Sequence, residues 1–195
     1  NKAIFKFLIF CSFLPISSPV LSEPSVTTKF KFYDIYPQTK SDLGKEMYAR
    51  TPIVYQGKKY DGYTSWYVNW RFGWRQKNGL CKISSVNTKL DIGYTMPRLP
   101  QQYQVDSTVR NAFDRYYSVL FEHEQGHKDS GLYAAREIER ELKSLGSFHN
   151  CQKLETAANQ KAHKIIKKYN ERDRNYDLQT QHGRLQGVDL NNFIN

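Results

Sequence analysis

The sequence contains no apolar run long enough to cross a membrane as a helix. Its longest run, FLIFCSFLPI at residues 7–16, would span about 15 Å, half of the roughly 30 Å hydrocarbon core of a bilayer. The run follows Lys2 and Lys6 and precedes the small-residue stretch SSPVLS, which ends at Ser22. This order is typical of a secretory signal peptide. We therefore expect cleavage after Ser22, a single domain over residues 23–195, and a secreted or periplasmic protein without a transmembrane anchor.

Cysteine is scarce, with three residues in the whole chain. Cys11 lies in the expected leader, which leaves Cys81 and Cys151. Because they lack C-x-x-C spacing, these two make a poor metal site. An even pair in an exported protein predicts a disulfide. It would close a loop of about 70 residues and stabilise the fold by on the order of 4 kcal/mol. Two buried free thiols are the alternative.

Acidic residues are the minority, 19 against 29 basic residues, for a net charge of +10. Without Lys2 and Lys6 the remaining domain carries +8. Such an excess attracts anionic surfaces at long range. In an exported protein these are anionic cell-envelope polymers and not nucleic acid. The densest basic group is expected to be a solvated helix face. It comprises Lys161, Lys164, Lys167 and Lys168.

Aromatic and β-branched residues alternate before the Pro97–Pro100 segment. SWYVNWRFGWR at residues 65–75 repeats with period two, which predicts a half-buried strand. Asn78-Gly79 follows as a hairpin turn signal. In the next stretch the apolar phase slips at Ser84-Ser85, which predicts a β-bulge. Shorter strands are expected within 29–36 and 51–60, around a helix near 41–49.

The apolar period becomes helical after Pro100. We expect one long helix from an N-cap at Asp106 or Ser107 to a stop at Gly146. A second helix is expected from about Leu154 to Tyr176. Strands followed by helices predict an α+β fold, with an N-terminal antiparallel β-sheet, a long active-site helix and a second C-terminal helix.

The apolar stripe of the long helix is interrupted between Leu120 and Ala134, where His123, Glu124 and His127 occupy its positions. These side chains therefore face the core and not the solvent. Burying them costs several kcal/mol unless their polar atoms find partners. Histidines at i and i+4 lie on one helix face, so their ring nitrogens can converge on one metal ion.

These three residues form the H-E-x-x-H pattern of zincin-like hydrolases, in which the histidines bind Zn²⁺ and the glutamate does not. Zinc activates a water molecule, and Glu124 is the expected general base. Chance would produce the pattern about 0.006 times in a chain of this composition. A buried, hydrogen-bonded His-Glu-His cluster without metal is the alternative.

A catalytic zinc site needs a third protein ligand and an open position for water. The metzincin continuation is absent, because Ser130 and Tyr133 stand where glycine and a third histidine would be. Glu137 would lie about 15 Å along an unbroken helix from His127. Two further histidines are weak candidates, in a loop and on a polar helix face. They are His149 and His163.

The segment NYDLQTQHG at residues 175–183 is otherwise unexplained. His182 within it is the predicted third ligand. Asp177 is the alternative ligand, or else a helix C-terminal group that orients a ligand imidazole. Tyr176 either donates a hydrogen bond to a developing oxyanion or closes the apolar face of the second helix.

The chain resembles the predicted secreted zinc-dependent proteases of bacteria, a family long treated as a domain of unknown function. The matching pieces, in order along the chain, are YDGYTSWYVNWRF (60–72), CKISSVNTKLDIGYTMPRLP (81–100), HEQGH (123–127), the cysteine of HNCQKLE (149–155) and YDLQTQHG (176–183). The resemblance implies zinc at His123 and His127 and Glu124 as general base. It also implies a functional role for Tyr176, Asp177, Thr180 and His182.

The expected function is that of an exported zinc metallopeptidase that hydrolyses peptide bonds in a peptide or protein substrate. An edge strand of the aromatic sheet would align an extended substrate beside the helix. One alternative is a zinc amidase or other hydrolase that acts on cell-wall material. Another is a non-catalytic envelope-binding protein, whose structural metal would be closed by four protein ligands.

Overall fold

The computed structural model describes residues 23–194, and the predicted signal peptide over residues 1–22 lies outside this range. The predicted α+β class is confirmed. A three-stranded sheet has the order β1 (Ser25–Asp34), β5 (Leu80–Arg98) and β4 (Tyr63–Lys77). β4 and β5 are antiparallel, whereas β1 pairs with β5 in parallel, so the sheet is mixed. β4 starts at the end of the sheet where β1 finishes and returns the chain to the start of β5, so β5 can lie parallel to β1 between them.

The β4–β5 hairpin has the predicted turn and the predicted bulge. Asn78 and Gly79 both have positive φ, 52° and 71°, as a type I′ turn requires. Gly73 pairs with Ser85 and Trp74 with Ile83, so Ser84 is the extra residue. The bulge reverses the facing of the side chains beyond it. This explains why the apolar positions change parity along β5.

The two long helices are α2 (Ser107–Lys143) and α3 (Cys151–Thr180). Asp106 caps α2 through a hydrogen bond from the Thr108 amide, as expected. α3 begins earlier and ends later than its apolar period predicts, so Tyr176 and Asp177 lie within its final turns. The smaller elements are α1 (Asp42–Arg50), β2 (Val54–Tyr55), β3 (Lys58–Lys59), the 3-10 helix η1 (Arg184–Gln186) and α4 (Asn191–Ile194).

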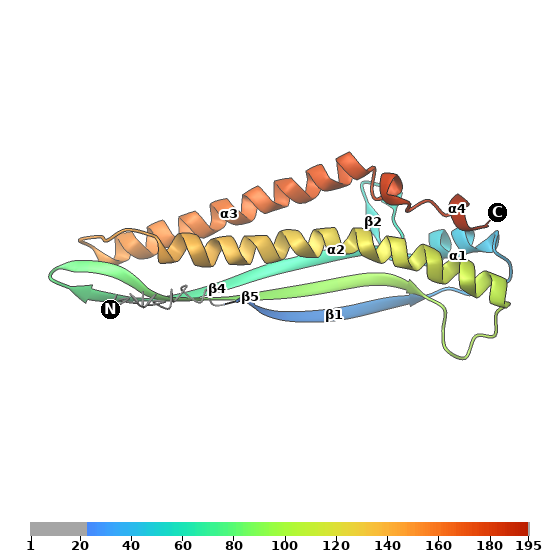
Figure 1. Ribbon diagram of the computed structural model, residues 1–195, viewed down its shortest axis with the longest axis horizontal. Coiled ribbons are helices and arrows are strands. Elements are labelled where there is room, and N and C mark those ends of the chain that lie inside the picture. Colours follow the sequence, from blue (N-terminus) through green and yellow to red (C-terminus); the bar gives the residue numbers. More distant parts are fainter. Residues whose placement is uncertain (1–22, 195) are drawn as a thin grey trace, which may run out of the picture.

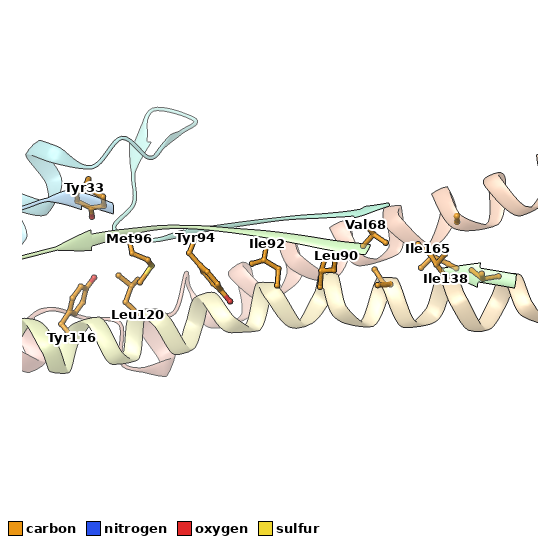
Figure 2. Packing of buried hydrophobic residues seen from close by; sticks show 14 of the residues in the cluster. Tyr33, Val68, Leu90, Ile92, Tyr94, Met96, Tyr116, Leu120, Ile138 and Ile165 are labelled. Carbon is orange, nitrogen blue, oxygen red and sulfur yellow. The ribbon is translucent and has the colours of Figure 1, made fainter. Parts of the chain in front are cut away.

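The sheet and the helices form an elongated, layered molecule in which α2 runs along one face of the sheet and α3 runs beside α2 (Figure 1). Leu90, Ile92 and Tyr94 of β5 pack against α2 in the core (Figure 2). α3 joins this core through a narrow stripe that includes Ala158 and Ile165. Neither of the two long helices packs on the opposite face of the sheet (Figure 1).

A disulfide and three indole hydrogen bonds also attach α3 to the β4–β5 hairpin. The predicted disulfide is present between Cys81 of β5 and Cys151, the first residue of α3. The indole N–H groups of three β4 tryptophans donate to polar side chains spaced along α3. These pairs are Trp66 with Asp173 (2.5 Å), Trp70 with Asn159 (3.0 Å) and Trp74 with Glu155 (2.7 Å). None of the described helices is both long and apolar enough to cross a bilayer.

Candidate metal centre

The three residues of the H-E-x-x-H pattern lie on the sheet-facing side of α2 and are buried. Their exposed fractions are 4% for His123, 4% for Glu124 and 8% for His127. The interrupted apolar stripe therefore predicted their direction correctly. Their polar atoms must find partners, because each would otherwise be buried at a cost of several kcal/mol.

Asp177 is brought to both histidines by the final turn of α3. Its Oδ1 atom lies 3.1 Å from His127 Nε2 and 3.3 Å from His123 Nε2. All three ligand atoms lie within 4.8 Å of one another. Four-coordinate zinc, with bonds of about 2.0–2.1 Å, places neighbouring ligand atoms about 3.3 Å apart. Two imidazoles and a carboxylate at this spacing fit such an ion.

The other ring nitrogen of each histidine also faces an acceptor. His123 Nδ1 lies 2.8 Å from Gln186 Oε1, and His127 Nδ1 lies 3.6 Å from Asp173 Oδ1. Asp173 Oδ1 is buried without a hydrogen bond, while Trp66 donates to the second oxygen of Asp173. Metal-binding histidines usually donate their outer N–H group to such acceptors, which fixes the tautomer and the ring orientation. The arrangement leaves both Nε2 atoms directed at the same point.

Asp173→Asn is expected to lower zinc affinity by about 10- to 100-fold, because the amide loses the charge that orients His127. Calorimetric titration with zinc measures this. Asn159→Ala is the matched control, since Asn159 accepts the indole hydrogen bond of Trp70 nearer the start of α3 and does not touch the histidines. If the zinc affinity of Asp173→Asn were unchanged, Asp173 would only bind the indole of Trp66 and would not orient His127.

Glu124 is held in one orientation between β4 and the segment that precedes it. Thr64 donates a hydrogen bond of 2.6 Å to Glu124 Oε2. A Cβ atom at Gly62 would lie 2.7 Å from Glu124 Oε1, so a side chain at this position would displace the carboxylate. Burial raises the pKa of Glu124 despite the Thr64 hydrogen bond. A carboxylate with a raised pKa is better suited to accept a proton near neutral pH.

The charges at the centre are strongly coupled in the metal-free protein. Burial lowers the pKa of His127, but its contacts with Asp173 and Asp177 outweigh burial and raise that pKa to about 10. Burial opposes ionisation of Asp177, yet the two histidines hold its pKa below the usual range. The metal-free centre therefore contains an imidazolium between two carboxylates, and a metal ion must replace its proton.

Tyr176 forms a wall of the centre. Its ring stacks on His123, with 5.0 Å between ring centroids, and its hydroxyl donates to the His123 carbonyl over 3.2 Å. This close approach requires Gly126, because a Cβ there would overlap the phenol ring of Tyr176. The geometry explains a glycine in the middle of a helix, where it is unfavourable by about 1 kcal/mol relative to alanine.

We expect Gly126→Ala to destabilise the fold by about 1–3 kcal/mol, because the added methyl group displaces Tyr176. Thermal unfolding of the metal-free protein measures the change. Gly146→Ala serves as the control, since nothing lies within 4 Å of a Cβ at Gly146. Equal stabilities of the two variants would show that Tyr176 can move at no cost.

His182, the predicted third ligand, lies beside the centre but is not one of the three converging groups. Its side chain is 48% exposed, and its Nδ1 atom lies 3.7 Å from Asp177 Oδ2. The His182 ring also contacts the Tyr60 ring, 5.0 Å away between centroids. Because α3 continues to Thr180, Asp177 occupies the place that the sequence assigned first to His182.

The other sequence candidates lie elsewhere. Glu137 accepts hydrogen bonds from Lys168 and Tyr169, and α2 continues unbroken between His127 and Glu137. His163 packs edge-on against Trp70, with 5.1 Å between ring centroids. His149 is exposed in the loop before α3.

An open cleft of about 840 Å³ leads to the centre. Its walls are the start of β4, the β2–β3 region, α2 and the second half of α3. Each of these elements contributes polar or aromatic side chains to the lining. They include Tyr55, Tyr60, Tyr63, Trp66, Lys59 and Arg174, together with His123, Glu124, His127 and Asp177.

Sequence reasoning missed three supporting residues, Asp173, Gln186 and Thr64. Asp173 and Asp177 share the i, i+4 spacing of the two histidines, so this pair could have been recognised as one helix face. Thr64 has the same parity as Trp66 and therefore points to the same side of β4. Gln186 gives no comparable signal, because only the turn after α3 brings it to His123.

Comparison with known proteins places the chain in a family but not among characterised relatives. No curated protein and no solved structure matches it significantly. The family described as "Bacterial protein of unknown function (DUF922)" matches residues 30–183. This range covers most of the sheet, both long helices, and the converging His123, His127 and Asp177. The chain therefore belongs to the DUF922 family of bacterial proteins.

Proposed function

We propose that this protein is an exported zinc metallopeptidase. The observation that carries the proposal is the convergence of two imidazoles and a carboxylate beside a buried glutamate, where an open cleft reaches them. A purely structural polar cluster would need no cleft. The disulfide between Cys81 and Cys151 supports an oxidising compartment outside the cytoplasm.

His123, His127 and Asp177 would hold the ion, and Gln186 and Asp173 would orient the two imidazoles. When bound at three protein ligands, zinc lowers the pKa of a water molecule to about 7 and polarises a carbonyl group. The proposal requires one coordination position to remain open to the cleft.

Glu124 would take the proton from the attacking water and pass it to the leaving amine. The hydrogen bond from Thr64 to Oε2 holds the carboxylate still, and the missing side chain at Gly62 makes room for Oε1. In the metal-free protein burial raises the pKa of Glu124. A carboxyl group that has taken the proton of the water can then act as the acid in the second half of the reaction.

A peptide substrate would lie along β4. This strand is at the edge of the sheet, and its first residues, including Thr64 and Trp66, line the cleft. An extended peptide can add to such an edge through backbone hydrogen bonds, while alternate side chains enter pockets on either side. The scissile bond would then pass beside Glu124.

A hydrolase that acts on cell-wall material is the second candidate, favoured by exposed tyrosines around the cleft. Tyr55, Tyr63 and Tyr67 all line it, and their exposed fractions are 62%, 52% and 68%. Tyrosine combines an apolar ring with a polar tip, and such rings stack on the apolar faces of sugars. Peptide side chains use the same surfaces, so the two candidates differ in substrate and not in the chemistry of Glu124.

Zinc titration of the metal-free protein, followed by substrate comparison, tests the proposal. We expect about one zinc ion per chain and, at pH 7, the release of a proton from His127, whose pKa of about 10 keeps it protonated until metal binds. Titration in buffers of different ionisation enthalpy counts this proton. The zinc-loaded protein should cleave an unfolded polypeptide, and cleavage of peptidoglycan fragments alone would select the second candidate. Hydrolysis that survives complete removal of the metal would contradict both.

A further inference from the structure

The face of the sheet that points away from α2 carries almost only positive charge. Side chains alternate between the two faces of a strand. Leu90 and Ile92 point into the core, and so do the residues paired with them on β1 and β4. The residues that precede and follow each of these along its strand therefore point outward. Seven cations and one carboxylate, Asp91, lie on this outer face, which gives it a charge of +6 out of +8 for residues 23–195. The cations are Lys29, Lys31, Arg71, Arg75, Lys77, Lys82 and Lys89.

Six of these seven cations have no ion-pair partner within the described part of the chain. Asp91 is bound by Lys89 at 2.7 Å, and the other six cations have no carboxylate within 4.0 Å among residues 23–194. Elsewhere many cations are paired, such as Arg50 with Glu46. Arg75 lies directly opposite Lys82 in the hairpin, and like charges at opposed positions are destabilising. A bound anion would remove this repulsion.

The outer face is long and continues into the cleft. Lys31, Ser65 and Thr95 belong to the outer face, and all three also line the cleft. From Thr95 to Lys82 the central strand extends for about 40 Å, at roughly 3.3 Å per residue. The cations therefore form a track along the molecule that ends near the metal centre.

From Arg71 to the hairpin turn the neighbours of the cations are small and hydrogen-bonding, whereas Tyr63 and Tyr67 lie on the outer face nearer the cleft. Between Arg71 and the hairpin turn the outer positions carry no aromatic ring, and the β5 side presents Ser84, Ser85 and Asn87. Single-stranded nucleic acid is bound by aromatic rings on which bases stack, and this stretch has none. Beyond Lys89 the sheet continues as the two-stranded β4–β5 hairpin, because β1 pairs only with residues 89–98. Two-stranded ribbons twist strongly and cannot present all their cations to one plane, so a planar bilayer is also a poor partner.

We propose that the outer face of the sheet binds an extended, hydroxyl-rich phosphodiester polymer of the cell envelope. Its phosphates would contact the lysine and arginine side chains, and its hydroxyl groups would meet the serine and asparagine side chains between them. A flexible chain can follow the twist that excludes a flat surface. The disulfide supports the compartment in which such polymers occur. Because the face has no metal ligand, this proposal does not rest on the proposed peptidase activity.

Fluorescence anisotropy with labelled poly(glycerol phosphate) tests the proposal on the full domain. The variant Arg71→Ser/Arg75→Ser/Lys82→Ser should lose affinity by about fivefold per cation, on the order of 100-fold in all, at low salt. It should also show a weaker salt dependence than the wild type, because fewer counterions are released. The control is Lys153→Ser/Lys164→Ser/Lys167→Ser, which removes the same charge from exposed positions of α3 and should bind nearly as the wild type does. Circular dichroism establishes that both variants fold.

Three results would overturn the proposal. Equal losses in the two triple variants would mean that only the net charge of the protein matters. If an oligothymidylate of the same charge bound as tightly as poly(glycerol phosphate), the outer face would bind any polyanion and would not recognise the hydroxyl-rich polymer. Tighter binding to phosphatidylglycerol vesicles, lost in the same outer-face variant, would identify a membrane surface as the partner.

Discussion

Replacing Glu124 by glutamine is expected to lower the rate of peptide hydrolysis by about 10²–10⁴-fold and to leave zinc binding unchanged. Glutamine keeps the size of the side chain and still accepts the hydrogen bond from Thr64, but it cannot take a proton from water. Because Glu124 is not one of the three converging ligands, the metal should stay. Steady-state kinetics and a zinc titration on the same preparation measure both effects.

Glu122→Gln is the matched control, since Glu122 lies on the same helix with its side chain exposed to solvent. It should retain full activity and full zinc binding. If hydrolysis persisted in Glu124→Gln at the rate of the control, the assigned proton transfer would be wrong. Loss of metal together with activity would instead mean that Glu124 is a ligand or that the variant has lost its fold, which thermal unfolding distinguishes.

Periodicity along the sequence was sufficient for most of the local structure. The alternation around Trp66 and Trp70 marked β4, and the parity change at Ser84-Ser85 correctly marked the bulge. The interrupted stripe of α2 predicted the direction of His123 and His127, because burial follows the helical period wherever one helix face meets a core. These features depend on residues close together in the chain.

Structural features that depend on contacts between residues far apart in the chain could not be predicted from local sequence patterns. The parallel pairing of β1 with β5 depends on how the chain returns after α1, and no local pattern records it. The last turns of α3 are polar, so the apolar period ended before Asp177 although the helix continues. This extension decides which side chain meets the histidines, and the apolar period alone does not reveal it.

Asp177→Asn is expected to lower zinc affinity by more than about 100-fold, beyond the effect of residues that only orient a ligand. The amide preserves the shape of the side chain but removes the anionic oxygen ligand that both Nε2 atoms face. His182→Ala should lower the affinity by less than about tenfold, because the half-exposed His182 contacts Asp177 and lies outside the converging group. Competition with a chromophoric chelator measures both variants under identical conditions.

The comparison of these two variants separates three sites that share His123 and His127. A loss in Asp177→Asn alone corresponds to three protein ligands and an open position, as catalysis requires. A loss in His182→Ala alone would mean that the turn after α3 rearranges on binding and supplies the histidine that the sequence suggested. A comparable loss in both would mean four protein ligands and a closed, structural ion. That last outcome would contradict the proposed peptidase even though the metal is bound, since no position would remain at which the ion could activate water.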